Sequence, residues 1–213
     1  TVVPVTITVT DDNLNSTTCS FDVTLEDSIA PILTCPSNIS VDSDAGLCSA
    51  NIAVSNPTID ENCSVSSITW SMTGATVANS PATGSNFVGT QPFNIGTTTI
   101  VYTVTDVANN VSTCSFTVTV TDNQDPTIAC PAPIAVNNDA DVCGAVVTYS
   151  VTSADNCPGQ VVTQTAGLAS GATFPIGVTT NTFLVTDASG NTATCSFTVT
   201  VTDNQDPTIA CPA

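Results

Sequence analysis

The chain has 213 residues, of which 18 are Asp or Glu and none is Lys, Arg or His, so its net charge at pH 7 is −18. Without a cationic side chain the chain cannot neutralise phosphates, which excludes binding of nucleic acid and attraction to anionic lipid. The usual general bases are also missing, so we expect no enzymatic activity. No apolar stretch reaches the roughly 18 residues that span a membrane, so we expect no direct membrane insertion.

Short segments with alternating apolar and polar residues follow one another along the chain, and each predicts a half-buried strand. The first strand, at residues 5–9, is followed by a turn at 11–15 and then a second strand, which predicts a β-hairpin. Further strands are expected at residues 32–35, 39–41, 49–54 and 68–72. Two more hairpins turn at residues 106–110 and 187–191. No apolar stripe with a period of 3.6 residues is present, so we expect essentially no helix.

The spacing of the ten cysteines shows that these strands belong to internal repeats. Successive gaps of 16, 13 and 15 residues recur as 16, 13 and 14, and residues 114–132 recur without change at 195–213. The first repeat has 13 extra residues between Cys63 and Phe93, which we expect in a loop. Units of this length, with a turn every eight to twelve residues, predict an all-β fold of tandem immunoglobulin-like β-sandwiches.

The repeat boundaries divide the chain into four segments. Two whole units are expected at residues 28–122 and 123–203. Residues 1–27 match the C-terminal part of a preceding unit, and residues 204–213 match the start of a following one. We therefore expect the partners of this chain to be neighbouring repeats of the same array, with self-assembly into a filament as an extension of that packing.

The ordered motifs of a repeat resemble a known family. The second whole unit contains Pro-Thr-Ile-Ala-Cys-Pro at 126–131, Asp-Asn-Cys at 155–157, Phe-Pro-Ile-Gly at 174–177 and Thr-Asp-Ala-Ser-Gly-Asn at 186–191. This set resembles the HYR (hyalin repeat) domain, and the first whole unit carries it with Glu61 in place of the first Asp. The resemblance covers essentially the whole chain. It implies an immunoglobulin-like sandwich that occurs in tandem in extracellular adhesion proteins and has no enzymatic activity.

The cysteines are expected to form disulfides rather than a zinc site, because the chain has neither His nor a Cys-x-x-Cys pair. Disulfides indicate an extracellular or cell-surface location. Four cysteines in a unit allow three pairings. We favour the pairs Cys35–Cys114 and Cys48–Cys63 in the first unit, and Cys130–Cys195 and Cys143–Cys157 in the second. Cys19 and Cys211 have no partner in these units, so we expect residues outside this chain to complete them.

Carboxylates gather near the predicted turns and the unit junctions. In an immunoglobulin-like sandwich one pole would bring together Asp122, Asp125, Asp155, Asn156 and Asp187. These side chains cap turns by bonding their own backbone, which is our first interpretation. The alternative is Ca²⁺, which takes six to eight hard oxygen ligands and would neutralise converging carboxylates where no cationic side chain is available.

We expect the chain to be part of a structural stalk or fibre of an extracellular adhesin, stabilised by disulfides and stiffened by calcium at the junctions. A repetitive sequence with near-identical units suits a stalk, since each unit needs only its neighbours. The alternative is a carbohydrate-binding or accessory module of a secreted enzyme. The sequence specifies no adhesion ligand.

Overall fold

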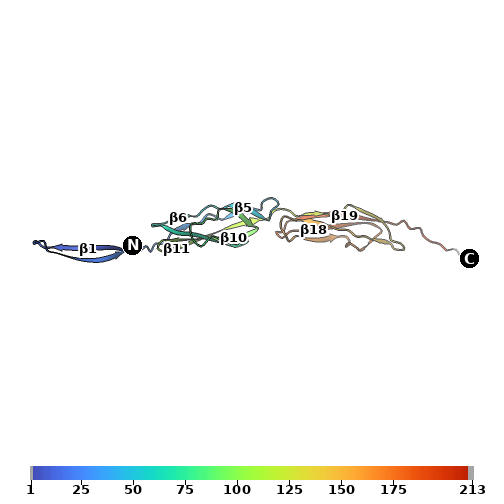
Figure 1. Ribbon diagram of the computed structural model, residues 1–213. Coiled ribbons are helices and arrows are strands. Elements are labelled where there is room, and N and C mark those ends of the chain that lie inside the picture. The colour runs from blue at the N-terminus through green and yellow to red at the C-terminus, as the bar shows by residue number, and fades with distance from the viewer. Residues whose placement is uncertain (1, 211–213) are drawn as a thin grey trace. The chain divides into compact units, whose positions relative to one another are not determined.

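The computed structural model describes residues 2–210, and within this range every regular element is a β-strand (Figure 1). This confirms the all-β fold class. Up to residue 121 the strands are β1 (Val2–Thr10), β2 (Ser16–Thr24), β3 (Ile32–Thr34), β4 (Ile39–Asp42), β5 (Ser49–Ala53), β6 (Thr58–Asp60), β7 (Val65–Gly74), β8 (Ala78–Asn79), β9 (Thr90–Asn94), β10 (Gly96–Asp106) and β11 (Val111–Thr121). The rest are β12 (Thr127–Ala129), β13 (Ile134–Asn137), β14 (Gly144–Val146), β15 (Thr152–Ala154), β16 (Val161–Ala166), β17 (Thr173–Pro175), β18 (Gly177–Thr186) and β19 (Thr192–Thr202).

The chain forms two compact units, and neither is a single continuous segment of the sequence. The first unit contains residues 1–40 and 51–119. The second contains residues 120–213 together with residues 41–50, which include the loop between β4 and β5. A segment from the first repeat of the sequence is therefore built into the second unit.

The strands of the first repeat form a sheet of order β4-β11-β10-β7-β8 and the two-stranded sheets β3-β6 and β5-β9, with the parts of β4 and β5 that fall in residues 41–50 assigned to the second unit. Alternating residues of β10 and β11 face inward, and Ile100, Tyr102, Val104 and Val118 are fully buried there, as the period-two pattern predicts. The strands expected near residues 32–35, 39–41, 49–54 and 68–72 are all present. Part of the 13-residue insertion forms the short edge strand β8, which pairs with β7, rather than a loop alone.

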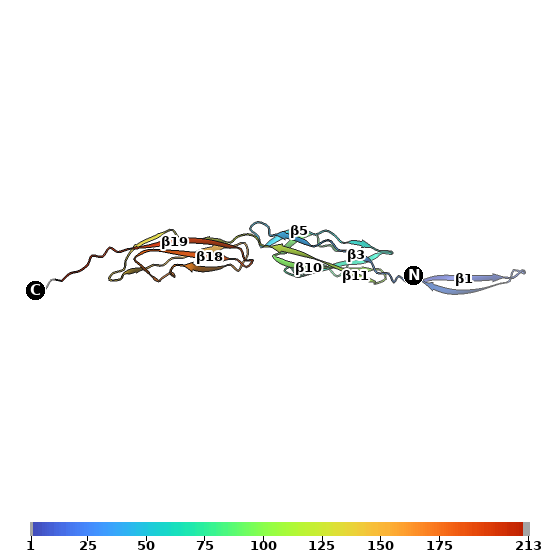
Figure 2. The same ribbon diagram turned by 180° about the vertical axis from the view of Figure 1, so that it is seen from behind.

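The second unit repeats this arrangement with one strand fewer. Its larger sheet has the order β13-β19-β18-β16, and the pairs β12-β15 and β14-β17 complete the sandwich. Strands β18 and β19 lie side by side as an antiparallel hairpin (Figure 2). Strand β13 pairs with β19 in the parallel direction. The core gathers Phe174, Phe183, Phe197 and Val199, with the ring of Tyr149 packed edge-on against the three Phe rings.

Strands β1 and β2 form a third antiparallel hairpin, whose sequence is a weaker copy of that of β10-β11 and β18-β19. Its apolar face is not covered. Ile7 is 49% exposed and Phe21 is 51% exposed, although the matching residues Tyr102 and Phe116 are 0% and 4% exposed. The hairpin therefore forms locally, but within the described chain it lacks the strands that cover this face in the two units.

All three hairpins turn in the same way because an Asp at the end of the first strand bonds the backbone ahead of it. In the last hairpin, Oδ1 of Asp187 accepts from the amides of Ser189 and Asn191, at 2.9 and 2.7 Å. Its Oδ2 accepts from the side-chain amide of Asn191 at 2.8 Å. Asp11 and Asp106 make the same set of bonds to their own turns. At these three positions the Asp side chain thus caps its own turn.

Candidate functional site: a disulfide-linked loop beside a buried acidic pair

Two disulfides tie the opening part of each repeat to its closing strand. Cys35 is bonded to Cys114 and Cys130 is bonded to Cys195, which confirms both of the expected long-range pairs. Cys114 and Cys195 lie at equivalent positions of β11 and β19. Each bond therefore links the segment after the first short strand of a repeat to its closing strand.

The expected short-range pairs are wrong. Cys48 is bonded to Cys157, at a sequence separation of 109, while Cys63 and Cys143 are free, exposed thiols. Cys19 is also free and exposed, and Cys211 lies outside the described residues.

The reason for this pairing lies in the length of the closing strand. In the second unit, Cys143 ends the loop that follows β13. This loop is hydrogen-bonded to the C-terminal end of β19, where the amide of Asn138 donates to the carbonyl of Thr202. Cys157 lies near the other end of β19, where Asn191 bonds Asp122 and Asp122 in turn bonds Asn156. The strand has 11 residues, so its ends are roughly 35 Å apart. A disulfide requires Cα atoms within about 7 Å.

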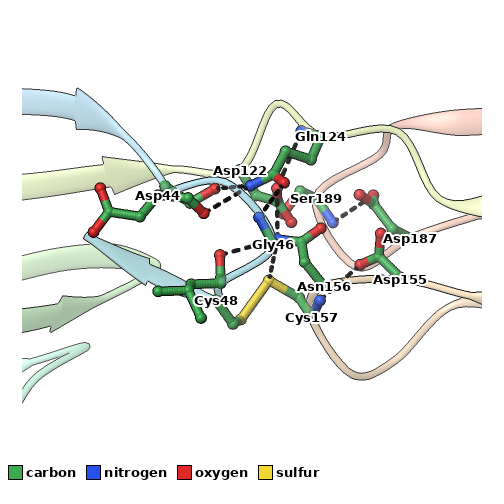
Figure 3. The surroundings of a disulfide bond; sticks show 12 residues. Asp44, Gly46, Cys48, Asp122, Gln124, Asp155, Asn156, Cys157, Asp187 and Ser189 are labelled. Atoms are coloured by element: carbon green, nitrogen blue, oxygen red, sulfur yellow. Dashed lines mark hydrogen bonds between the residues drawn. A yellow bond between two sulfur atoms is a disulfide. The ribbon is translucent and has the colours of Figure 1, made fainter. Parts of the chain in front are cut away.

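Polar contacts hold the Cys48 loop in the second unit (Figure 3). Gln124 Nε2 donates to the hydroxyl of Ser43 at 2.9 Å and to the carbonyl of Asp44 at 3.1 Å. Its Oε1 accepts from the amide of Gly46 at 2.8 Å. On the other side, the side-chain amide of Asn156 donates to the carbonyl of Leu47 at 3.1 Å. Residues 124 and 156 thus clamp the loop whose last residue forms the disulfide.

Beside this loop two carboxylates come together, from the buried Asp122 and the half-buried Asp155. Asp122 and Asp155 each place a carboxylate oxygen within 4.8 Å of the other and of the sulfur of Cys157. One oxygen of each is in use, since Asp122 Oδ1 accepts from Asn156 and Asp155 Oδ2 accepts from the amide of Cys157. The other two, Asp122 Oδ2 and Asp155 Oδ1, are buried and have no hydrogen-bond partner. Buried acceptors of like charge are unfavourable unless a partner compensates them.

The structure brings together only part of the predicted calcium set. Asp122, Asp155 and Asn156 form one group, as just described. Asp125 is exposed and is not in that group. Asp187 uses both of its carboxylate oxygens in its own turn. Burial opposes ionisation of Asp187, but hydrogen bonds from Asn191 and from the backbone of residues 189–191 outweigh it, so its pKa lies below the ordinary 3.8.

The sequence reasoning missed Gln124 as a clamp for the loop. One signal for it was present, because Gln124 and Gln205 recur at the same place in two consecutive junctions. The structure gives Gln205 the same role, since its Oε1 accepts from the amide of Asp141 at 3.2 Å. A second group of the same kind occurs in the first unit, where Asp27, Glu61 and Cys63 place their ligand atoms within 4.8 Å of one another.

Comparison with known proteins identifies the repeats. The family model described as "HYR domain" matches residues 26–120 and 121–201. The chain is 31% identical over 205 residues to Hyalin of Strongylocentrotus purpuratus, covering 91% of the chain and 16% of that protein. It is 32% identical over 220 residues to Hyalin of Lytechinus variegatus, covering the whole chain and 39% of that protein. The chain thus spans well under half the length of these two relatives.

Among solved structures, cadherin ectodomains overlap this chain at low TM-scores and low identity. Drosophila N-cadherin EC1-4 overlaps 81% of this chain and 49% of its own, with a TM-score of 0.38 and 13% identity. Protocadherin Gamma B2 extracellular cadherin domains 1-5 overlap 96% of this chain and 46% of their own, with a TM-score of 0.36 and 16% identity. The fold assignment rests on the strand topology and not on these overlaps. Residues 2–210 contain no helix long and apolar enough to cross a membrane.

Proposed function

The chain belongs to the HYR family, and from this membership we propose that it is a structural segment of an extracellular adhesion protein, in which tandem repeats form a disulfide-stabilised stalk. As a disulfide-bonded member of this family, the chain is extracellular or lies at the cell surface. The proposed role is mechanical, and the repeats themselves are the principal partners.

One observation carries this proposal. The Cys48–Cys157 disulfide joins a residue of the first family match, 26–120, to a residue of the second, 121–201. Covalent bonds between consecutive repeats have little use in a module that only binds a small ligand, but they resist extension in a stalk under load. The loop around Cys48 is also clamped by Gln124 and Asn156, so the bond lies in a built polar site rather than in a flexible connection.

We further propose that a divalent cation, with Ca²⁺ as the first candidate, binds beside this disulfide. Asp122 Oδ2 and Asp155 Oδ1 fit such an ion, because both are hard, buried oxygens without a partner. An ion there would remove the repulsion between the two carboxylates. Calcium takes six to eight ligands, so main-chain carbonyls or waters would complete the shell.

Calorimetry of the full chain tests the cation. We expect EDTA to lower the melting temperature of the second unit and Ca²⁺ to restore it. Asp122→Asn should abolish this dependence and should melt above the parent chain in EDTA, since it removes one of two buried like charges. Asp12→Asn, at an exposed position of the first hairpin, is the matched control and should keep the calcium response. Equal melting temperatures in EDTA and Ca²⁺ for the parent chain would refute the cation site.

Small-angle scattering of the same samples tests the stalk. With the Cys48–Cys157 bond intact and Ca²⁺ present, we expect a maximum dimension that is independent of ionic strength. Cys48→Ser/Cys157→Ser in EDTA should give a broader distribution of distances, because the connection becomes flexible. A distribution that is equally broad for the parent chain in Ca²⁺ would contradict a stiff stalk.

A further inference from the structure

The first unit contains an open cleft of about 830 Å³, lined by residues 25–29, 62–63 and 107–108. In the repeat alignment, its lining residues occupy the positions that hold the Cys48 loop in the second unit. Asp27 corresponds to Asp122, and Cys63 corresponds to Cys157. The cleft is therefore a second copy of the loop-binding site, with no loop in it among the described residues.

The wall of this cleft shares two hydrogen bonds with the loop-binding site of the second unit. Asn62 Nδ2 donates to Asp27 Oδ1 at 3.2 Å, as Asn156 does to Asp122 at 3.3 Å. The amide of Cys63 donates to Oε1 of Glu61 at 3.0 Å, and the amide of Cys157 donates to Oδ2 of Asp155 at the same distance.

The unpaired atoms correspond as well. Asp27 Oδ2 and Glu61 Oε2 are buried without a hydrogen-bond partner, like their two counterparts in the second unit. Two differences remain in the polar groups. Ile29 stands where Gln124 makes three hydrogen bonds to the loop of the second unit, and Asn62 has no carbonyl to take the place of that of Leu47. The cleft thus has the built polar wall of a site that holds a loop elsewhere in the same molecule.

The matching loop also recurs, at residues 138–143. The amide of Asp139 donates to the carbonyl of Gly144 at 2.7 Å, and that of Val142 to the carbonyl of Asp139 at 3.1 Å. The corresponding bonds in the Cys48 loop, from Asp44 and Leu47, measure 2.8 and 2.9 Å. The loop thus has the same backbone bonds without a disulfide, and Cys143 at its end is an exposed thiol.

The uncovered hairpin indicates what carries the missing loop. In the second unit, β13 pairs with the closing strand β19 and leads directly into the loop that ends at Cys143. Strand β2 is similar in sequence to that closing strand, with Cys-Ser-Phe in common, and its apolar residues Phe21 and Val23 are 51% and 39% exposed. A repeat that covers the Val2–Thr24 hairpin with its remaining strands would therefore present its cysteine loop at the chain segment that begins the cleft, Leu25–Ile29.

We propose that this cleft is a socket for the cysteine loop of a preceding HYR repeat, closed by a disulfide to Cys63, and that Cys143 is the matching loop cysteine for the socket of a following repeat. The proposal rests on the tandem role proposed above and adds its linkage rule, in which the second cysteine of each repeat bonds the third cysteine of the next. An array built this way has one covalent bond across every junction, besides the bond within each repeat.

The bond forms by thiol–disulfide exchange with a small disulfide such as oxidised glutathione. The Cys63 thiolate attacks the small disulfide, releasing one reduced thiol and leaving a mixed disulfide. The thiolate of the incoming loop then displaces the second reduced thiol, so two protein thiols are oxidised and one small disulfide is reduced. A hydrogen bond to Asp27 and the nearby carboxylates raise the pKa of the exposed Cys63 thiol, so we expect the exchange to accelerate at alkaline pH.

The test is an extended chain in which a copy of residues 123–177 replaces Thr1, so that Val2–Thr24 becomes the closing hairpin of a whole repeat. After refolding with oxidised and reduced glutathione, free thiols are alkylated and the disulfides are mapped by non-reducing peptide mass spectrometry. We expect Cys63 to bond the copied loop cysteine and Cys19 to bond the copied opening cysteine. Cys143 should remain alkylated. In the matched control, with the copied loop cysteine changed to Ser, Cys63 should become alkylated while the bond to Cys19 persists.

Two results would overturn the proposal. If Cys19 is bonded and Cys63 is alkylated in the extended chain, the added repeat has folded and the socket does not take its loop; the tandem role would survive this result. If neither cysteine is bonded, the hairpin is not the closing part of a repeat, and the tandem role loses its support as well. The two failures are thereby distinguished.

Discussion

Replacing both Cys48 and Cys157 by Ser is expected to destabilise the second unit by about 4 to 5 kcal/mol. The chain-entropy model assigns about 4.8 kcal/mol to a cross-link with the observed separation of 109 residues when the whole chain unfolds. If the first unit stays folded, the free chain between the two cysteines shortens to about 40 residues, and the same model gives about 4 kcal/mol. Either value is a large share of the 5 to 15 kcal/mol that a domain has in total.

Urea unfolding under non-reducing conditions measures this loss. With a slope of about 2 kcal/mol per M, we expect the midpoint of the second unit to fall by roughly 2 M. Cys63→Ser is the matched control and should leave the midpoint unchanged, because Cys63 is an exposed thiol without a disulfide. A shift of less than about 0.5 M in the double variant would show that Gln124 and Asn156 hold the loop without the bond, and would refute the entropic argument.

Three further predictions concern the second unit. Phe174→Ala should cost about 3 to 5 kcal/mol in urea unfolding, because the side chain is fully buried in the core, and a loss below about 1 kcal/mol would contradict the assigned core. Gly167→Ala should cost clearly more than Gly171→Ala. Both have positive φ, at +90° and +86°, but a Cβ at 167 would overlap the side chain of Asn181, whereas one at 171 meets nothing, so equal losses would refute that overlap. Because the pKa of Asp187 is lowered in the folded state, its contribution is present above the ordinary 3.8 and is lost as pH falls below it. When the pH is lowered below 3.8, the free energy of unfolding of Asp187→Asn should therefore fall less than that of the parent chain. Identical dependence of the two free energies on pH would contradict the lowered pKa of Asp187.

Local chemistry made the strands and turns predictable from the sequence. Alternation of apolar residues indicated β10 and β11 and the face that they bury, since side chains of a strand point to opposite faces in turn. The turns at Asp106 and Asp187 were equally clear, because an Asp bonds the amides directly after it in the chain. The strand β8 was missed, since two residues carry no periodic pattern.

The pairing of the cysteines was only partly predictable. Cys35–Cys114 and Cys130–Cys195 followed from tying the opening of a repeat to its closing strand. For Cys48 the nearest cysteine in the sequence, Cys63, was the wrong choice. The strand expected at residues 39–41 already argued against this pair. It lies between Cys35 and Cys48, so it carries the Cys48 loop to the other end of the sandwich from the opening segment.

The sequence by itself determined the repeats, the all-β class, the closing strands and the absence of any cationic side chain, because these follow from composition and from patterns a few residues long. Only the tertiary structure decided that residues 41–50 join the second unit, that Cys48 bonds Cys157, and that the carboxylates of Asp122 and Asp155 come within 4.8 Å of each other. The physical reason is the length of the closing strand. Its 11 residues place the loops that carry the second and the third cysteine of a repeat at opposite ends of the sandwich. Distance in space, rather than spacing along the chain, therefore selects which cysteines form a disulfide.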